Sequence, residues 1–352
     1  MATKRLLYLD NLRVALTMLL IAHHVGQAYG PTGGDWPIQE ALRAPVLGPF
    51  FTVNRSFFMS LFFMIAGYFT VMSCDSNGPR RFLKNRLLRL GLPVLAMGLL
   101  MIPLKLFVFH SPSILPIEVG HLWFLEHLLI FGACYALWRM LRPAPAPASP
   151  VEANPPGYLP ILAFALALAV VLMVVRIFFH IDQWTYLLGF IRVAFADLPR
   201  DLAFYIIGLV AYRKQWFSSF STRAGYTWLA VGLVAAGLWY GYALLVYKSL
   251  LPYNDTAMGI IYPIWEMILC CGMCIGLTVL FREMLDFQGR IARAMGQSQY
   301  AAYIFHLFGV LLFQFAVLSL DLPPLVKFIL VTLVSIPATF LFSNWVRKPL
   351  HL

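Results

Sequence analysis

The sequence predicts an all-α, polytopic integral membrane protein, a bundle of about ten transmembrane helices with both termini in the cytoplasm. The 352 residues are 61% hydrophobic and only 12% charged, with a mean hydropathy of +0.78. Water-soluble domains average roughly 45–50% apolar and about 25% charged residues. The apolar runs are continuous rather than alternating, which argues against transmembrane strands. The high apolar and low charged content excludes a soluble cytosolic enzyme and a disordered scaffold.

Ten segments are long and apolar enough to cross the roughly 30 Å of bilayer hydrocarbon as helices. They are Leu12–Tyr29, Phe50–Met72, Leu90–Phe109, Leu122–Leu141, Tyr158–Phe179, Leu198–Tyr212, Tyr226–Tyr247, Met258–Phe281, Ala301–Leu320 and Leu325–Val346. The sixth is the weakest because Asp197, Arg200 and Asp201 crowd its start. An earlier start near Tyr186 is the alternative. We treat residues 1–352 as one transmembrane domain.

The distribution of basic residues predicts the orientation of the chain. Lys and Arg number 26 against 15 Asp and Glu, which gives a formal net charge of +11. Basic residues concentrate in cytoplasmic loops, and with ten spans the basic loops fall on one side together with both termini. The charge therefore indicates sidedness rather than nucleic-acid binding. The Pro- and Ala-rich residues 142–157 are expected to form a cytoplasmic linker between the first four spans and the last six.

The first span concentrates ionisable residues, which are costly inside a membrane and are therefore functional candidates. Arg13 and His24 lie eleven residues apart, and eleven steps of about 100° return to within about 20° of one helix face. Asp10 precedes Arg13 by one turn. His24 is expected roughly 18 Å along the span, a little past the bilayer middle. The alternative for His24 is a packing contact with a neighbouring helix, and this is our interpretation of His23.

A basic segment between the second and third spans is a candidate phosphate site. It carries five basic residues within ten positions, among them Arg81, Arg86 and Arg89. Several guanidinium groups can bind one polyanion, and arginine binds phosphate oxygens in a bidentate manner. The segment therefore predicts a site for a phosphate-bearing donor. The alternative is an ordinary basic loop that contacts lipid headgroups.

Five blocks of the sequence resemble the acyltransferase-3 family of membrane O-acyltransferases. YLDNLRVALTMLLIAHH is similar to the family's opening helix, whose Arg/Lys-x10-His motif falls on Arg13 and His24. FFMSLFFMIAGYF resembles the second helix, RRFLKNRLLRLGLP the basic Arg-x-x-Arg loop and HLWFLEHLL the Trp-Phe-Leu helix. GQSQYAAYIFH resembles the late Ser-x-Tyr…His segment through Ser298, Tyr303 and His306. LGLP and HLWFL also resemble the branch that succinylates periplasmic glucans.

The resemblance implies transfer of an acetyl or succinyl group from cytoplasmic acyl-CoA to a hydroxyl of an extracytoplasmic glycan, glycolipid or small glycoside. His24 is the expected base, with Arg13 and Asp10 beside it. A transient acyl-imidazole on His24 is the open alternative. Acyl-CoA is then a donor substrate, and neither a tightly bound cofactor nor a metal is expected. The C-x-x-C formed by Cys271 and Cys274 lies in an apolar span, where we expect packing thiols.

The resemblance also implies roles for residues outside the first span. The phosphates of the donor are expected on the three arginines, and the donor path is expected to pass Ser298, Tyr303 and His306. An aromatic belt is the alternative for Tyr303.

Trp123, Glu126 and Glu266 are candidates for substrate contact or charge support. Asp10 or Glu126 is expected to balance the charge of Arg13, because a buried arginine needs a partner. A pair at an interface is the alternative for Glu126 and His127. Arg176 is one candidate partner of Glu266.

Two other function classes fit the composition. A transporter or exporter of a glycan or anionic metabolite would also carry intramembrane His, Arg and Glu, but no internal repeat is visible. The third hypothesis, after the enzyme and the transporter, is a structural subunit of a glycan-assembly complex. For the enzyme we expect a multi-pass protein of a bacterial inner membrane, and a homo-oligomer is left open.

Overall fold

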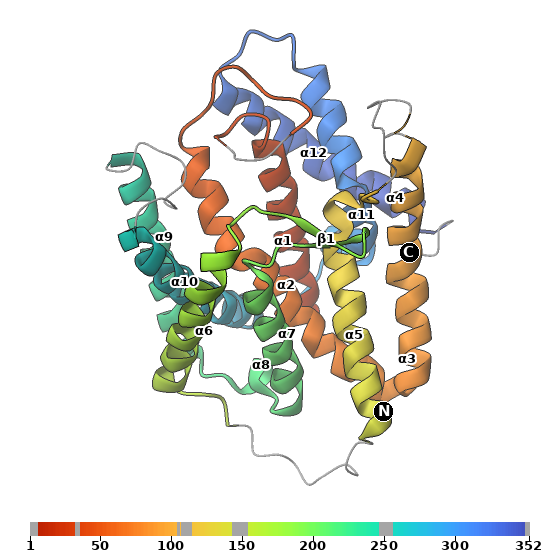
Figure 1. Cartoon of the computed structure of the whole chain (residues 1–352), viewed down its shortest axis with the longest axis vertical. Helices are drawn as coiled ribbons and strands as arrows, with labels where there is room; N and C mark the ends of the chain where they lie inside the picture. Colours follow the sequence, from red (N-terminus) through yellow and green to blue (C-terminus); the bar gives the residue numbers. More distant parts are fainter. Residues whose placement is uncertain are drawn as a thin grey trace. The chain divides into compact units, whose positions relative to one another are not determined.

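The fold is given by a computed structural model, which describes residues 6–31, 36–103, 106, 115–142, 154–245 and 256–348. The helices are α1 (Leu7–Gly26), α2 (Leu47–Asn77), α3 (Pro79–Arg86), α4 (Leu92–Pro103), α5 (Trp123–Leu141), α6 (Tyr158–Phe178), α7 (Leu198–Arg213), α8 (Trp216–Ser219), α9 (Thr222–Leu245), α10 (Thr256–Met284), α11 (Arg290–Ala316) and α12 (Pro324–Val346). Eight helices in the described ranges are long and apolar enough to cross a membrane. The prediction of an all-α, multi-pass membrane protein is therefore confirmed (Figure 1).

The two remaining predicted spans are also helical. Helix α1 has 20 residues but carries the polar stripe of the first span. Helix α7 has 16 residues, which is about 24 Å of helix and short of the hydrocarbon thickness. The alternative start of this span near Tyr186 is wrong, because α7 begins at Leu198 and Tyr186 lies in a strand. Most of the predicted Pro/Ala linker lies outside the described residues.

The basic segment that we expected to be a loop is helical. Gly78, with a φ of 76°, separates α2 from α3, and Pro79 occupies the first turn of α3, where its missing N–H costs nothing. A π-helical turn, Leu87–Gly91, then joins α3 to α4. Pro93 explains this turn, because a proline ring clashes with the carbonyl four residues earlier, here that of Arg89. Residues Pro79–Pro103 therefore form one membrane-length helix with a local bulge.

A short β-hairpin precedes α7 and was not predicted. Strands β1 (Thr185–Leu187) and β2 (Ile191–Val193) are antiparallel, and Tyr186 lies opposite Arg192. Leu188 and Gly189 in the connecting loop have φ values of 53° and 79°. A leucine in the left-handed region is uncommon, so the sequence carries little signal for this turn.

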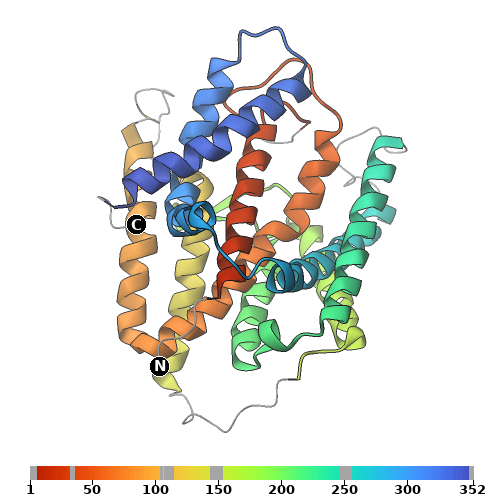
Figure 2. The same cartoon turned by 180° about the vertical axis from the view of Figure 1, so that it is seen from behind.

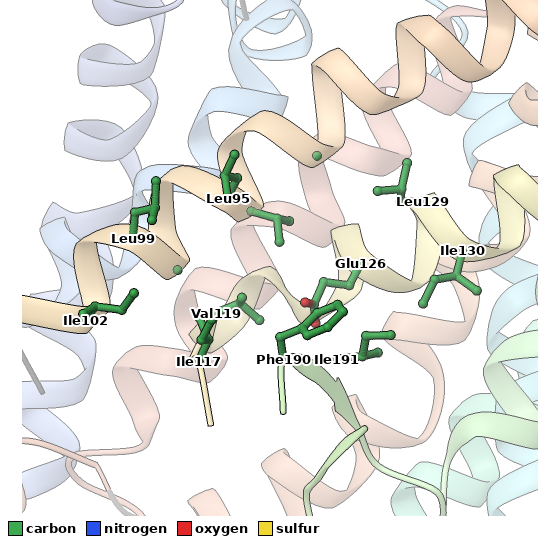
Figure 3. A pocket seen from close by; sticks show the side chains of 13 residues that line it. Leu95, Leu99, Ile102, Ile117, Val119, Glu126, Leu129, Ile130, Phe190 and Ile191 are labelled. Atoms are coloured by element: carbon green, nitrogen blue, oxygen red, sulfur yellow. The ribbon is translucent and has the colours of Figure 1, made fainter. Parts of the chain in front are cut away.

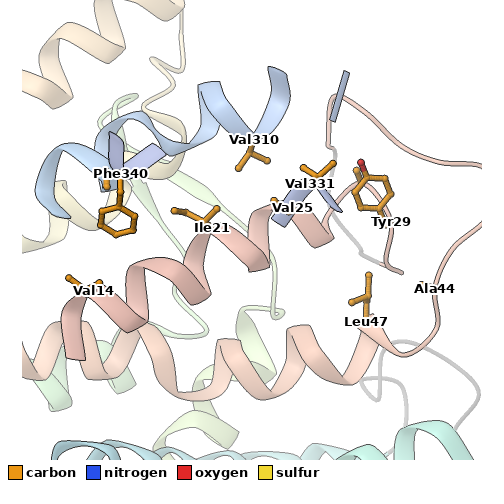
Figure 4. Packing of buried hydrophobic residues seen from close by; sticks show 11 residues of the cluster. Val14, Ile21, Val25, Tyr29, Ala44, Leu47, Val310, Val331 and Phe340 are labelled. Atoms are coloured by element: carbon orange, nitrogen blue, oxygen red, sulfur yellow. The ribbon is translucent and has the colours of Figure 1, made fainter. Parts of the chain in front are cut away.

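The chain divides into two compact units. Unit 1 comprises residues 1–62, 156–170 and 220–352, and unit 2 comprises residues 63–155 and 171–219. In unit 1, α9 packs along α10, and α1 packs against α10, α11 and α12 (Figures 1 and 2). Figure 4 shows the core of this packing, where Val14, Ile21 and Val25 of α1 face Val310 and Phe340 of α11 and α12.

Candidate active site

Helices α1 and α11 lie side by side in unit 1 and run in the same direction. Gln299 Nε2 donates a hydrogen bond to Thr17 Oγ1 at 3.3 Å, and His306 Nε2 lies 3.1 Å from His24 Nδ1. The same separation of 282 residues joins both pairs, so seven residues along α1 match seven along α11. Only parallel helices give this register. Seven residues are about two turns, so the polar contacts fall on one line between two mostly apolar helices.

The two titratable side chains that meet along this line are His24 and His306, which we call the histidine pair. His306 is fully buried and His24 is half-buried. His306 Nδ1 lies 2.8 Å from the Tyr303 carbonyl, and His24 Nδ1 lies 3.1 Å from the Leu20 carbonyl. A carbonyl oxygen only accepts, so each Nδ1 carries the hydrogen. The His24 Nδ1–H is then shared with His306 Nε2, and His24 Nε2 is the nitrogen with the basic lone pair.

Arg13 and Asp10 lie on α1 toward its N-terminus. The Arg13 guanidinium is 3.7 Å from the Asp10 carboxylate, and their side chains are 31% and 11% exposed. Thr17 Oγ1 donates to the Arg13 carbonyl at 2.9 Å. Arg13 therefore stays accessible on the helix face that it shares with His24, with a carboxylate one turn away.

Asn11 fastens the start of α1 to the segment between α10 and α11. Its amide nitrogen donates to the carbonyls of Leu285 and Phe287 at 2.7 and 2.8 Å. Its amide oxygen accepts from Gln288 Nε2 at 2.9 Å. The sequence analysis missed Asn11, although an amide beside Asp10 at the entry of a span is the type of residue that caps neighbouring backbone.

Residues 36–44, which we call the cap, fold over the other end of α1. The Trp36 ring stacks on the His24 ring, with centroids 5.8 Å apart and planes at 28°. Trp36 Nε1 donates to Gln314 Oε1 at 2.8 Å, and Gln314 Nε2 donates to the Val25 carbonyl at 3.0 Å. The sequence analysis missed Trp36, since a tryptophan in a loop has no periodic signal that shows where it folds.

A buried ion pair and backbone hydrogen bonds hold the cap in place. Lys327 Nζ of α12 lies 2.6 Å from the Glu40 carboxylate, and its side chain is only 3% exposed. The Glu40 N–H donates to the Ala28 carbonyl at 3.0 Å, and the Ala44 N–H donates to the Tyr29 carbonyl at 2.8 Å. The cap is therefore part of the folded structure of unit 1.

The residues assigned to the donor path occupy α11 in different ways. His306 meets His24 directly. The Ser298 hydroxyl donates to its own helix, at the Ala294 and Met295 carbonyls. Tyr303 is buried, with its ring centroid 6.1 Å from that of His306. Of these three residues, His306 hydrogen-bonds to His24 through its side chain, and Tyr303 contacts His306 through its backbone carbonyl.

The three arginines of the basic helix differ in their surroundings within unit 2. Arg86 donates to Thr70 Oγ1 at 3.1 Å and lies 5.1 Å from the centre of the Phe82 ring. Tyr205 donates to the same Thr70 hydroxyl at 3.0 Å. Arg81 and Arg89 are exposed. Two of the three guanidinium groups are thus accessible, and the third contacts the helices beside it.

Glu126 and Trp123 belong to a cluster in unit 2 that joins α5 to the hairpin. Glu126 Oε2 accepts the Arg192 N–H at 3.1 Å, and His127 Nε2 lies 3.2 Å from the Arg192 carbonyl. Trp123 packs 5.2 Å from both His127 and Trp184. These contacts attach the hairpin to the start of α5.

A mostly apolar pocket of about 310 Å³ lies beside this cluster. Leu95, Leu99, Ile130 and Phe190 are among its lining residues, and Figure 3 shows the Glu126 carboxylate next to Phe190. Glu126 is the charged residue of this lining. In the nearby hairpin, burial raises the pKa of the Tyr186 hydroxyl, and the positive charge of Arg192 opposes that rise.

Glu266 is fully buried in α10. Arg176, a candidate partner for it, lies 3.0 Å from the Asp197 carboxylate. No group of three or more His, Cys, Asp or Glu side chains suited to a metal ion occurs within the described part of the chain.

Most of the chain matches a known protein family. Residues 6–344 match the acyltransferase-3 family model, described as an acyltransferase domain. The chain is 28% identical over 153 residues to "Glucans biosynthesis protein C" of Escherichia coli O6:K15:H31 (strain 536 / UPEC), and equally to that of strain K12. These alignments cover 38% of this chain and 39% of each relative, so the match spans less than half of the relatives' length. The comparison with solved structures gave no match.

Proposed function

The chain belongs to the acyltransferase-3 family and is a multi-pass membrane O-acyltransferase, and from this premise we propose its donor, acceptor and base. The donor is a cytoplasmic acyl-CoA that carries an acetyl or succinyl group. The acceptor is a hydroxyl of an extracytoplasmic glycan or glycoside, and a glucan comes first because similar proteins are named for glucan biosynthesis. The base is His24. We place the enzyme in a bacterial inner membrane.

The observation that supports this proposal most is the hydrogen bond between His24 and His306. It holds His24 in the tautomer whose Nε2 accepts a proton. The acceptor hydroxyl oxygen attacks the thioester carbonyl as Nε2 takes the hydroxyl proton. The C–S bond then breaks, and the leaving thiolate of CoA receives that proton. A positioned base of this kind contributes about 10²–10⁴-fold to the rate.

His306 acts as a positioning residue in this proposal. When Nε2 of His24 gains a proton, His306 Nε2 accepts a stronger hydrogen bond from His24 Nδ1. The Tyr303 carbonyl in turn accepts from His306 Nδ1. The positive charge that develops on His24 is thus spread over a chain of hydrogen bonds inside a low-dielectric bundle.

Donor binding is assigned to residues with accessible positive charge. Arg81 and Arg89 contact the phosphates of CoA, while Arg86 supports the helix from its bond to Thr70. Arg13 contacts the pantetheine arm on the face that leads to His24. The thioester then reaches His24 in the last turn of α1, beyond the mid-bilayer depth that the sequence predicted, and the acceptor arrives from the opposite side.

The experiment that tests the base compares His24→Ala with His23→Ala. His23 is the matched control, because it is the adjacent residue and its ring packs on Phe51 and Phe58 at 5.1 and 5.3 Å. A strain that lacks the gene receives each variant, and NMR measures the O-acyl groups on its periplasmic and surface glycans.

We expect wild type and His23→Ala to restore the acyl signals, and His24→Ala to restore none at equal membrane abundance. Restoration by His24→Ala would show that His24 is structural. Glycans that are the same with and without the wild-type gene would exclude a glycan acceptor.

A further inference from the structure

The cap covers one face of the His24 ring, and we propose that Trp36 is a positioning residue that excludes water from the acyl donor at His24. By this exclusion, Trp36 directs the acyl group to the acceptor hydroxyl instead of to water. The inference rests on the acyl-transfer function proposed above. It identifies the residue that sets the ratio of transfer to hydrolysis at that site.

The stacking geometry places an apolar surface where water would otherwise reach the base. The Trp36 and His24 rings are 5.8 Å apart at 28°, and His306 occupies another side of the His24 ring at 4.9 Å. With the cap in place His24 is half-buried, so part of the residue stays open to substrates while Trp36 covers one face of the ring. Removing the indole would therefore open one ring face to solvent.

Two hydrogen bonds fix the indole in this position. Trp36 Nε1 donates to Gln314, a fully buried residue of α11. Gln314 in turn donates to the Val25 carbonyl in the last turn of α1, one residue after His24. Rotation of Trp36 would leave the buried Gln314 oxygen without this donor, which is unfavourable.

The Lys327–Glu40 ion pair fixes the segment that carries Trp36. Lys327 is 3% exposed and the Glu40 side chain 19%, so the pair is largely removed from water. A buried pair adds little net stability but strongly disfavours separation of its members. The cap therefore has a defined closed position on α12.

Water and a sugar hydroxyl are alternative nucleophiles for the same thioester. In both reactions the nucleophile's oxygen attacks the carbonyl, His24 takes its proton, the C–S bond breaks and CoA leaves as the thiol. One reaction gives an acylated sugar and the other a free acid. Exclusion of water from the donor is the physical means of favouring the first.

The first test measures this partition in purified enzyme supplied with acetyl-CoA or succinyl-CoA and a glucan. Total CoA release and acylated glucan are measured for wild type, Trp36→Leu and Trp36→Phe. We expect Trp36→Leu to raise the ratio of hydrolysis to transfer about tenfold, with little change in the KM for the donor. Trp36→Phe keeps a ring over His24 and should recover most of the wild-type ratio. Trp345→Leu, at a position 74% exposed, controls for the loss of a tryptophan.

The second measurement needs no turnover, so it decides the role of the cap even if the wild type does not release CoA. Diethyl pyrocarbonate modifies accessible imidazoles, and mass spectrometry gives its rate at His24 relative to exposed His180. We expect about tenfold faster modification of His24 in Trp36→Leu and a clear increase in Glu40→Gln, which weakens the attachment of the cap.

An unchanged partition in an active, folded Trp36→Leu enzyme overturns the proposal, as does an unchanged rate of modification. A wild type without CoA release refutes the proposed function instead. If Trp36→Leu does not fold, Glu40→Gln carries both measurements.

Discussion

Two imidazoles joined by one hydrogen bond behave differently from a single imidazole in a membrane. His306 is fully buried and holds Nδ1–H on a carbonyl, so its remaining nitrogen is available to His24. A proton gained by His24 is then shared along a hydrogen-bond chain instead of being held by one isolated ring.

Replacing His306 with alanine should lower kcat about 100-fold, because the His24 Nδ1–H loses one acceptor and the positive charge is less stabilised. The KM for acyl-CoA should change much less. Initial rates of CoA release and acylated product, measured against donor concentration, separate the two constants. Phe308→Ala, at a position 52% exposed on the same helix, is the control. A normal kcat in His306→Ala would refute the role of the pair.

Asn11 gives a prediction about stability rather than rate. Asn11→Ala removes partners from two backbone carbonyls and from Gln288, so we expect it to lower the free energy of unfolding by about 1–3 kcal/mol. Thermal unfolding in detergent measures the change. Asn77→Ala is the control, because Asn77 is exposed and its side chain bonds only within its own helix end at the Ser73 carbonyl. Equal melting temperatures for both variants would show that the hydrogen bonds of Asn11 do not stabilise the fold.

Residue patterns predicted the shared face of Arg13 and His24 because helical periodicity is a local property. The family resemblance brought His306 into the candidate site, but its contact with His24 was not predicted. The register between two helices 282 residues apart cannot be inferred from the sequence of either helix. Trp36 was missed for the same reason: the fold of a loop depends on distant partners, here Gln314 and Lys327.

At the scale of elements, the basic helix shows how one proline changes the direction of several side chains. A π-turn adds one residue to a turn, which rotates everything before it by about 100° relative to everything after it. If residues Leu87–Gly91 formed a regular α-helical turn, the Arg86 side chain would point in a different direction relative to α4. We predicted a loop for this segment because basic residues often accumulate in the loops between spans. The backbone of the segment is instead helical.

Pro93→Ala should allow a regular α-helix and turn Arg86 away from Thr70. Arg81, on the same side of the π-turn as Arg86, turns with it. We therefore expect an increase of about tenfold in the apparent KM for acyl-CoA, the size of one lost contact between Arg81 and a donor phosphate, with a smaller change in kcat. Donor titrations of purified enzyme measure both constants. Pro103→Ala, at the far end of the same helix, is the control. An unchanged KM for acyl-CoA would show that the π-turn has no role in donor binding.

Two glycines in unit 2 permit a close approach of α2 and α7. A Cβ at Gly67 would collide with the Tyr205 carbonyl, and one at Gly208 would collide with the Met64 carbonyl. Gly67→Ala and Gly208→Ala should each lower the free energy of unfolding by about 1–3 kcal/mol. Thermal unfolding again measures this. Gly237→Ala, where a Cβ meets nothing within 4 Å, should not be destabilising. Three equal melting points would disprove the close approach.

At the level of the whole molecule, composition and length predicted the class, because they determine which segments suit a bilayer. Of the ten predicted spans, eight are long and apolar enough within the described residues, while α1 and α7 are not among them. The division into two units was not predicted. Two of its boundaries fall inside the helices α2 and α6, at points that no change in composition or hydropathy marks. Such a boundary depends on which neighbours each half of a helix contacts.

The predicted orientation can be tested with single cysteines and a maleimide that does not cross membranes. Leu188→Cys, at a hairpin position 82% exposed, should react in intact cells. Asn85→Cys, exposed in α3, should react only after the membrane that holds the protein is permeabilised. The wild-type protein measures the background, since of its five cysteines only Cys134 is exposed. The reverse pattern would place the basic helix outside.

The parallel pairing of α1 with α11 has a consequence for how the enzyme is made. His24 is synthesised 282 residues before His306. At about 5–20 residues per second the interval is on the order of tens of seconds. Throughout that interval the nascent chain carries an imidazole without its partner helix. A product truncated before α11 therefore lacks the histidine pair on which the proposed activity depends.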